Sequence, residues 1–258
     1  MATWSLDPEE FAALWFGPAN DRMLHPLTYL SRFTHVNERD EYWTRVRHEW
    51  SDRGRLDWDE SDLLTRTFAV LTEPEAWVEV HGSCEGVGPI RIAAARHDRH
   101  AAVAVQFTKR PRIDVSIISA ENLPTALAKL LPDRPPGQRG PETFHTDDLD
   151  PTKQPIVRYT NDSTPLERYR RLLDLPGSGA GLITVLRGPR YSTSAPPRRI
   201  GTVRWFDTRD GRYLETGSSN RTVRPATIST LRDALTRMLD HAINEYREYT
   251  DELGEFAR

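Results

Sequence analysis

One pattern of strands followed by a helix occurs twice in this 258-residue sequence, in the same order. Alternating apolar residues predict a first set of four strands and a helix, over residues 77–81, 90–96, 101–107, 112–117 and 122–131. A second set is predicted over residues 181–186, 199–206, 212–215, 221–224 and 227–253. Most connections within a set are too short for helical crossovers, so we expect antiparallel hairpins.

The two sets also match residue by residue. When residues 89–131 are placed on residues 197–239, at a constant shift of 108, ten positions are identical. They are Pro89/Pro197, Arg91/Arg199, Ile92/Ile200, Arg96/Arg204, Thr108/Thr216, Val115/Val223, Leu123/Leu231, Ala126/Ala234, Leu127/Leu235 and Leu131/Leu239. Neither half can bury its own sheet alone, so we expect the halves to pair across a pseudo-two-fold axis. This predicts one domain over residues 1–258, with a first half at 1–131, a connector at 132–163 and a second half at 164–258.

Capping signals mark several helices outside the strand sets. Asp7 and Glu10 form a capping box around Pro8, which predicts a first helix stopped by Gly17. Two amphipathic helices are expected over residues 34–53, ending at Gly54, and over residues 59–72. Thr164 and Glu167 form a second capping box, which opens a helix to about Leu175.

Turn and connector signals separate these elements. The proline-rich segment 132–140 and the polar residues up to 164 predict a connector, and Asp210-Gly211 predicts a tight turn. Residues 177–181 (GSGAG) follow a helix and precede a strand. Phosphate-binding loops need the reverse order, so this segment is interpreted as a flexible connector.

Composition excludes several classes of function. The 35 basic and 38 acidic residues nearly balance, for a net charge of -3, which disfavours a nucleic-acid-binding module. No apolar run approaches the roughly 20 residues of a membrane helix, and the start MATWSLDPEE does not resemble a signal peptide. A single cysteine, Cys84, fits a reducing compartment. We therefore expect a soluble cytoplasmic protein that does not insert into membranes.

The usual catalytic and metal-binding patterns are weak. His97 and His100 lack further ligands at recognisable spacing, so a solvated turn explains them better than a metal site. Cys84, in an expected loop near His81, lacks the signature of a catalytic cysteine, and Asp147/Asp148 lie in a polar stretch. We expect no catalytic residues, metal or cofactor. The alternative is a small-molecule-binding protein or hydrolase with a pocket between the two halves.

A series of short motifs gives the chain a resemblance to a known family. The motifs are Leu6-Asp7-x-x-Glu10-Phe11-x-x-Leu14-Trp15, Arg22-x3-Pro26-Leu27, Thr34-x3-Glu38-Arg39, Arg53-Gly54-x-Leu56, Pro74-x3-Val78-Glu79-Val80, Leu130-Leu131-Pro132-x2-Pro135-Pro136-Gly137 and Phe206-Asp207-Thr208-x2-Gly211-Arg212-Tyr213-Leu214. In order, spacing and length, the chain to about Leu239 resembles the EspG family of type VII (ESX) secretion-associated proteins.

This resemblance implies a fold and a function. The fold would be α+β, with a central antiparallel sheet flanked by two helical bundles in pseudo-two-fold-related halves. The function would be that of a non-enzymatic cytosolic chaperone. Such a chaperone binds a PE–PPE-like helical heterodimer at the apolar tip of its PPE subunit, keeps it soluble and delivers it to the secretion apparatus. The oligomeric state is left open.

The resemblance also points to a partner-binding surface. The loop between the first two strands of the repeat maps to Ser83–Gly88, and the equivalent loop of the second half to Arg187–Arg198. The last helix would add tyrosines, which are enriched at interfaces. Solvated loops or a solvated helix surface explain these residues equally well. The candidate contact residues are Ser83, Glu85, Val87, Arg190, Tyr191, Tyr246 and Tyr249.

Overall fold

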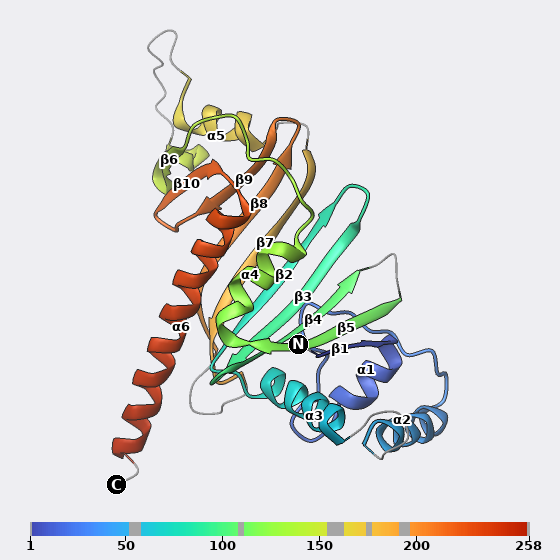
Figure 1. Cartoon of the computed structure of the whole chain (residues 1–258). Coiled ribbons are helices and arrows are strands. Elements are labelled where there is room, and N and C mark those ends of the chain that lie inside the picture. The colour runs from blue at the N-terminus through green and yellow to red at the C-terminus, as the bar shows by residue number, and fades with distance from the viewer. Residues whose placement is uncertain are drawn as a thin grey trace.

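Antiparallel strand pairing dominates the structure. The computed structural model describes residues 2–51, 58–107, 111–153, 163–173, 177–190 and 197–256, and within them ten strands form one continuous sheet (Figure 1). The strand order is β1-β5-β4-β3-β2-β7-β8-β9-β10-β6, and all neighbouring strands run antiparallel. The predicted α+β fold with a central antiparallel sheet is confirmed.

The strands and helices have the following bounds. The strands are β1 (Ala2–Leu6), β2 (Ala76–Cys84), β3 (Gly88–His97), β4 (His100–Phe107), β5 (Arg112–Ser119), β6 (Glu142–His145), β7 (Gly177–Arg187), β8 (Arg198–Thr208), β9 (Gly211–Thr216) and β10 (Asn220–Pro225). The α-helices are α1 (Pro8–Trp15), α2 (Val36–Ser51), α3 (Trp58–Thr72), α4 (Leu123–Leu130), α5 (Pro165–Leu173) and α6 (Ile228–Phe256). Short 3₁₀ helices are η1 (Ala120–Asn122), η2 (Thr146–Leu149) and η3 (Pro151–Lys153).

The contact between β2 and β7 joins two similar sets of elements. On one side, β2 to β5 form a meander that leads into α4, and β1 pairs with β5. On the other side, β7 to β10 form a meander that leads into α6, and β6 pairs with β10. This order agrees with the two strand sets read from the sequence. The pseudo-two-fold axis between the halves stays a prediction.

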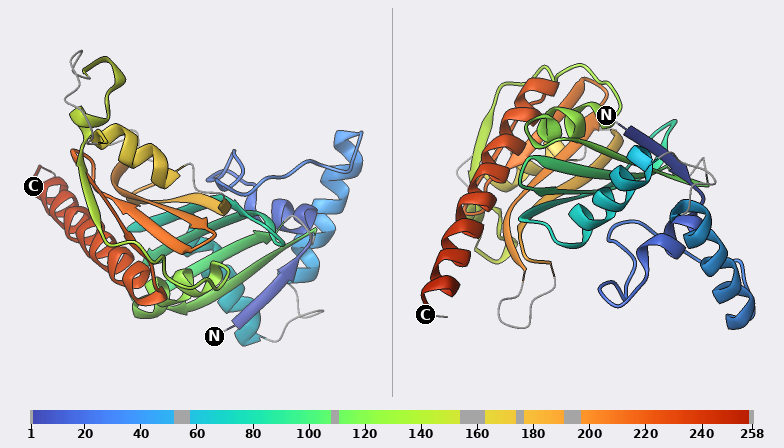
Figure 2. Two further views of the ribbon diagram at one scale, coloured as in Figure 1. Left: turned by 90° about the horizontal axis from the view of Figure 1, so that it is seen from above. Right: turned by 60° about the horizontal axis from the view of Figure 1, so that its bottom comes forward.

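Helices α4 and α6 cover one face of the sheet, which we call the α6 face (Figure 2). Alternate residues of the central strands point to this face, as period-two strand geometry requires. The helices contribute apolar residues three or four positions apart. The buried residues include Val78, Val80, Ile92, Val103, Ile183, Val185 and Leu214 from strands, and Leu123, Leu127, Leu231, Leu235 and Leu239 from helices.

Two separate groups of helices cover parts of the opposite face, which we call the α1 face. In the first half, α1, α2 and α3 enclose a core that includes Trp4, Phe11, Trp15, Trp50, Leu71, Trp77 and Ile113. In the second half, α5 encloses a smaller core of Phe144, Tyr169, Leu172, Phe206, Tyr213 and Val223. Figure 2 shows these groups rising at opposite sides of the curved sheet.

The predicted helix starts carry the expected caps. The Asp7 carboxylate accepts hydrogen bonds from the amides of Glu9 and Glu10, both at 2.8 Å, and Glu10 accepts one from the amide of Asp7 at 2.8 Å. The Thr164–Glu167 box is likewise closed by reciprocal bonds of 3.0 and 3.2 Å. Both capping boxes are therefore confirmed. Gly54, the predicted stop of the second helix, lies outside the described residues.

Three predictions about loops are wrong. The segment Gly177–Gly181 is not a connector but the first part of β7. Cys84 is the last residue of β2, buried at 1% exposure, and not part of a loop. Within the expected connector, residues 142–145 form β6. In addition, β1 was not predicted, and its Trp4 and Leu6 are buried.

A close approach of strands explains the glycines at the start of β7. Gly82 of β2 pairs with Gly181 of β7, and Gly181 pairs with Trp205 of β8. A Cβ atom at Gly181 would lie within 2.5 Å of the backbone oxygen of His81, and one at Gly82 would lie 2.7 Å from the Trp205 ring. The fully buried Trp205 indole thus occupies the space that side chains would fill at the β2–β7 contact.

The carboxylate of Glu9 fixes the chain that follows α1. It is 3% exposed, and it accepts hydrogen bonds from the Tyr29 hydroxyl (2.5 Å), the Trp43 indole (2.8 Å) and the Arg32 amide (3.1 Å). Burial alone would raise the pKa of Glu9, but these donors outweigh burial and hold its pKa below the ordinary value of 4.5. The charged form is therefore part of the folded state.

We expect Gly181→Ala to destabilise the fold by about 3 kcal/mol, because the added methyl group would displace Trp205 and press on the β2 backbone. Urea denaturation measures this change in the free energy of unfolding. Gly140→Ala is the matched control, since nothing lies within 4 Å of its Cβ position. Equal stability of the two variants would contradict this role of Gly181.

We expect Glu9→Gln to lower the free energy of unfolding by about 2 kcal/mol at neutral pH, because it removes a charged acceptor of several buried hydrogen bonds. A lowered pKa means that the unfolded chain binds the proton more readily, so this stabilisation is present above about pH 4.5 and is lost as pH falls further. The difference between wild type and variant should therefore shrink below pH 4. Glu38→Gln, on the exposed side of α2, should change stability little at any pH.

Candidate partner-binding surface

The tip of the β2–β3 hairpin carries three of the predicted contact residues. The turn comprises only residues 85–87, so Ser83 lies in β2 and Gly88 in β3. The side chains of Ser83 and Glu85 are exposed, and Val87 is half-buried against the core of the α6 face. The Glu85 amide donates to the carbonyl oxygen of Ser178 at 2.5 Å. The tip is thus held against β7 of the other half.

The other predicted contact residues that the structure describes lie toward the opposite end of β2. Arg190 is 8% exposed, its Nε donates to the carbonyl oxygen of Leu71 at 3.3 Å, and its guanidinium lies 4.6 Å from the centre of the Trp77 ring. Tyr246 and Tyr249 are half-buried, and the guanidinium of Arg187 lies 4.5 Å from the centre of the Tyr249 ring. Tyr191 lies outside the described residues.

The structure does not bring the predicted residues together. The hairpin tip lies at one end of β2, whereas Arg187 and Tyr249 lie at the other end, where α6 continues past the sheet (Figure 1). Strand β2 has nine residues, so its two ends are eight residue steps apart. At ~3.3 Å per residue, the two groups are separated by about 26 Å. A compact contact site can include one of these groups, and a contact with both requires an elongated partner.

A buried polar cluster lies directly beneath the hairpin tip. The Cys84 thiol lies 3.8 Å from Oδ2 of Asp207, whose two carboxylate oxygens accept hydrogen bonds from Arg212 at 2.6 and 2.8 Å. Burial, and then the Asp207 carboxylate, raise the pKa of the Cys84 thiol. Because a nucleophilic cysteine needs a lowered pKa, this cluster is suited to holding the hairpin and not to covalent catalysis.

A small hollow lies between the two halves at this end of the sheet. Its volume is about 360 Å³, and it is lined by Glu85, Arg134, Gly177, Ser178, Thr208 and Arg209. The lining is polar and comes from turns and strand ends. It lacks the apolar floor that is typical of small-molecule sites.

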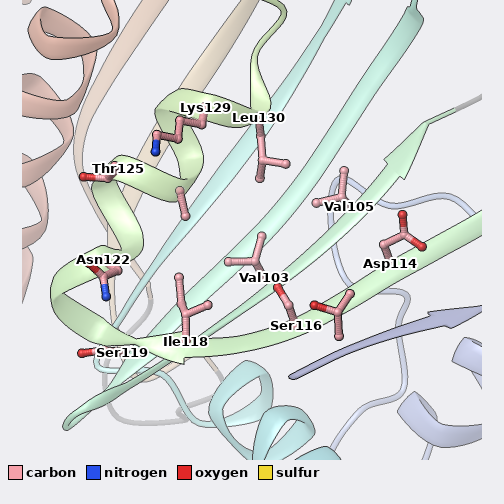
Figure 3. A pocket seen from close by; sticks show the side chains of 12 residues that line it. Val103, Val105, Asp114, Ser116, Ile118, Ser119, Asn122, Thr125, Lys129 and Leu130 are labelled. Atoms are coloured by element: carbon pink, nitrogen blue, oxygen red, sulfur yellow. The ribbon is translucent and has the colours of Figure 1, made fainter. Parts of the chain in front are cut away.

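A larger and more apolar groove lies on the α6 face of the first half, and we call it the α4 groove (Figure 3). Its volume is about 690 Å³. Helix α4 forms one wall, and β4, β5 and β1 form the floor. Val103, Val105, Ile118 and Leu130 provide its apolar surface, and Thr3, Asp114, Ser116, Ser119, Asn122, Thr125, Ala126 and Lys129 complete the lining.

A second groove lies beside α6 in the other half, and we call it the α6 groove. Its volume is about 630 Å³, and its lining includes Arg199, Ile200, Val203, Ser218, Ala234, Arg237, Met238 and His241. Three helix positions that line it lie 108 residues after positions that line the α4 groove: Ala126/Ala234, Lys129/Arg237 and Leu130/Met238. This spacing equals the sequence shift between the two predicted halves. The α6 groove is the more cationic of the two.

Sequence reasoning missed the residues of the α4 groove. The prediction of β5 rested on Ile113, Val115 and Ile117, which point to the α1 face and are buried. The alternate residues Asp114, Ser116 and Ile118 therefore had to point to the α6 face. The alternation of β5 was the available signal, because it places Asp114, Ser116 and Ile118 together on one face.

The other polar residues noted in the sequence have structural partners. Nδ1 of His97 lies 2.7 Å from the carbonyl oxygen of Glu73, next to the β3–β4 turn. Asp147 forms an exposed ion pair with Lys153 at 2.6 Å. Among the described residues, no cluster of three or more His, Cys, Asp or Glu side chains could hold a metal ion, and no helix is long and apolar enough to cross a membrane.

Comparison with known proteins places these features in a family context. A family model described as EspG family matches residues 7–237. A solved structure of the Mycobacterium tuberculosis type VII secretion system chaperone EspG5 in complex with the PE25-PPE41 dimer is similar, with a TM-score of 0.59 and 12% sequence identity. The match covers 93% of this chain and 96% of that chain, which shows a common fold. No curated protein matches the sequence.

We expect the Cys84 thiol to react slowly in the folded protein, because it is 1% exposed and its pKa is raised. Iodoacetamide at pH 8 should modify it at least about 100-fold more slowly than in 6 M guanidinium chloride, as measured by intact mass. Modification at equal rates in both conditions would show that the hairpin end opens readily, contrary to the packed cluster described above.

Proposed function

This chain belongs to the EspG family, and from that premise we propose that it is a cytosolic chaperone of a type VII secretion system. Its partner would be a PE–PPE-like helical heterodimer, bound at the apolar tip of the PPE-like subunit. Binding would keep the pair soluble and competent for export. The family match over residues 7–237 is the observation that carries this proposal.

The fold supports the same function. The chain shares its fold with EspG5, a type VII secretion system chaperone solved in complex with PE25-PPE41. The family model spans both halves and the connector, which supports one domain over residues 1–258. The apolar tip of a PPE-like subunit would promote aggregation if it were left in water. A complementary surface on this chain that covers that tip until export would prevent aggregation.

The hairpin tip is the part of the predicted surface best placed for this contact. Ser83 and Glu85 are exposed, and Val87 presents an apolar edge beside them. The backbone bond from Glu85 to Ser178 and the buried Asp207–Arg212 pair hold the tip in place. A preformed loop loses less conformational entropy when it binds, which favours affinity.

The protein would act without catalysis or a cofactor. Its only cysteine has a thiol pKa raised by burial, and the hollow between the two halves is small and polar. These features do not favour the alternative of a hydrolase or small-molecule-binding protein. The nearly balanced charge, with a net value of -3, also fits a protein partner better than nucleic acid.

Co-expression with candidate PE–PPE-like pairs tests the proposal. We expect a 1:1:1 complex on size-exclusion chromatography with multi-angle light scattering. We expect Val87→Asp to weaken the complex about tenfold or more, because a charge would be buried in an apolar contact. Affinity is measured by biolayer interferometry with the purified pair.

Val36→Asp is the matched control for this experiment. Val36 is 59% exposed at the start of α2, so the same substitution there should leave both stability and binding unchanged. Separate elution of this protein from each candidate pair would contradict the chaperone function. Equal binding by Val87→Asp and wild type would remove the hairpin tip from the contact surface.

A further inference from the structure

The α4 groove is an unfilled part of the helical layer on the α6 face. Helices α6 and α4 pack side by side and cover the central strands, but β4, β5 and β1 continue beyond α4. We propose that one helix of the secreted heterodimer lies in the α4 groove, antiparallel or parallel to α4, and completes this layer. This inference rests on the proposed chaperone function.

The form of the groove favours a helix over an extended peptide. Its floor is the face of a sheet, where the backbone groups of β4 and β5 already pair with neighbouring strands. An extended peptide lying over β4 and β5 would find no main-chain partners there and would leave its own amide and carbonyl groups unpaired. A helix satisfies its backbone internally and offers only side chains, which is what this floor can bind.

The dimensions fit one helix. From β4 to β1 the floor spans about 10 Å, at ~4.8 Å between strands, which equals the diameter of an α-helix. Along β5, from Asp114 to Ser119, the floor extends about 16 Å, or about three helical turns. Ser116 and Ala126 are small, so the groove admits a helix close to its floor (Figure 3).

The lining also defines the chemistry of the bound helix. Val103, Val105, Ile118 and Leu130 require an apolar stripe with residues three or four positions apart. Asp114 rises from the floor at one end and forms no hydrogen bond or ion pair within the described residues. The bound helix should therefore carry a lysine or arginine at the edge of its apolar stripe, opposite Asp114.

The groove lies on the same face of the sheet as Val87 of the hairpin tip. Val87 at the hairpin tip, Ile118 and Leu130 are all half-buried at the margin of the same apolar core. Ile90 of β3, near the tip, pairs with Phe107 of β4, and Phe107 pairs with Arg112 of β5. The tip therefore lies two strands away from the end of the groove that contains Asp114. A helical pair held at the tip can therefore extend one helix into the groove.

Cysteine footprinting on the co-expressed complex tests this inference. Ser116→Cys places a thiol on the floor of the α4 groove, and Ser218→Cys places one in the α6 groove as the matched control. We expect complex formation to slow alkylation of Ser116→Cys at least tenfold and to leave Ser218→Cys unchanged. The slow reaction of Cys84 keeps the background low. Equal protection of both thiols, or of neither, would overturn the inference.

Binding measurements complete the test. We expect Ser116→Trp to weaken binding of the pair at least tenfold by filling the groove, and Ser218→Trp to bind as wild type. Asp114→Lys should weaken binding, and Asp114→Asn should do so less. Thermal melting of each variant verifies its fold. If the wild-type complex forms but these variants bind normally, the groove assignment is wrong and the chaperone function stands; if no complex forms with wild type, the chaperone function itself is wrong.

Discussion

The pairing of β2 with β7 is the interaction on which the rest of the structure depends. It joins two five-stranded sets into one sheet and leaves β1 and β6 as the edge strands. Without it, two long central strands would become open edges, which promote aggregation. Gly82 and Gly181 face each other across this pairing, and the buried indole of Trp205 covers both. The core of the α6 face then extends across both halves, because α6 packs on β2, β7 and β8.

This shared core determines which surfaces remain for partners. On the α1 face, two helical groups cover only the outer parts of the sheet, and polar residues lie between them. Glu79 lies 3.1 Å from Nδ1 of His25, and Arg204 forms an ion pair with Glu215. On the α6 face, the 29-residue α6 packs on β2, β7 and β8, and the eight-residue α4 packs beside α6. The α4 groove lies beside α4 in the first half, and the α6 groove lies beside α6 in the second half. Ile118 and Leu130 in the α4 groove and Val87 at the hairpin tip are half-buried apolar side chains on this face.

The sequence was most informative where local physics decides the structure. Capping boxes, alternating strands and the apolar stripe of α6 depend on near neighbours, and the predicted elements match closely. The predictions failed where contacts between residues distant in the sequence determine the local structure. GSGAG resembles a linker because its role as a strand depends on Trp205, which lies 24 or more residues away in the chain. Strand β1 is too short to show a pattern and exists because β5 offers it an edge. Likewise, no spacing rule places Tyr249 and Glu85 at opposite ends of β2.

A chaperone of this kind needs a surface that is apolar enough to bind yet ordered before its partner arrives. The hairpin tip meets both demands, because Val87 is anchored on the core and the Asp207–Arg212 pair is buried under the turn. A buried ion pair adds little net stability compared with apolar packing, but breaking it leaves an uncompensated charge, so it holds one arrangement of the strand ends. The α4 groove follows the same logic, since its floor is made of paired strands and its wall is a packed helix. Both proposed surfaces would therefore bind without folding first, and the entropy of ordering would fall mainly on the partner.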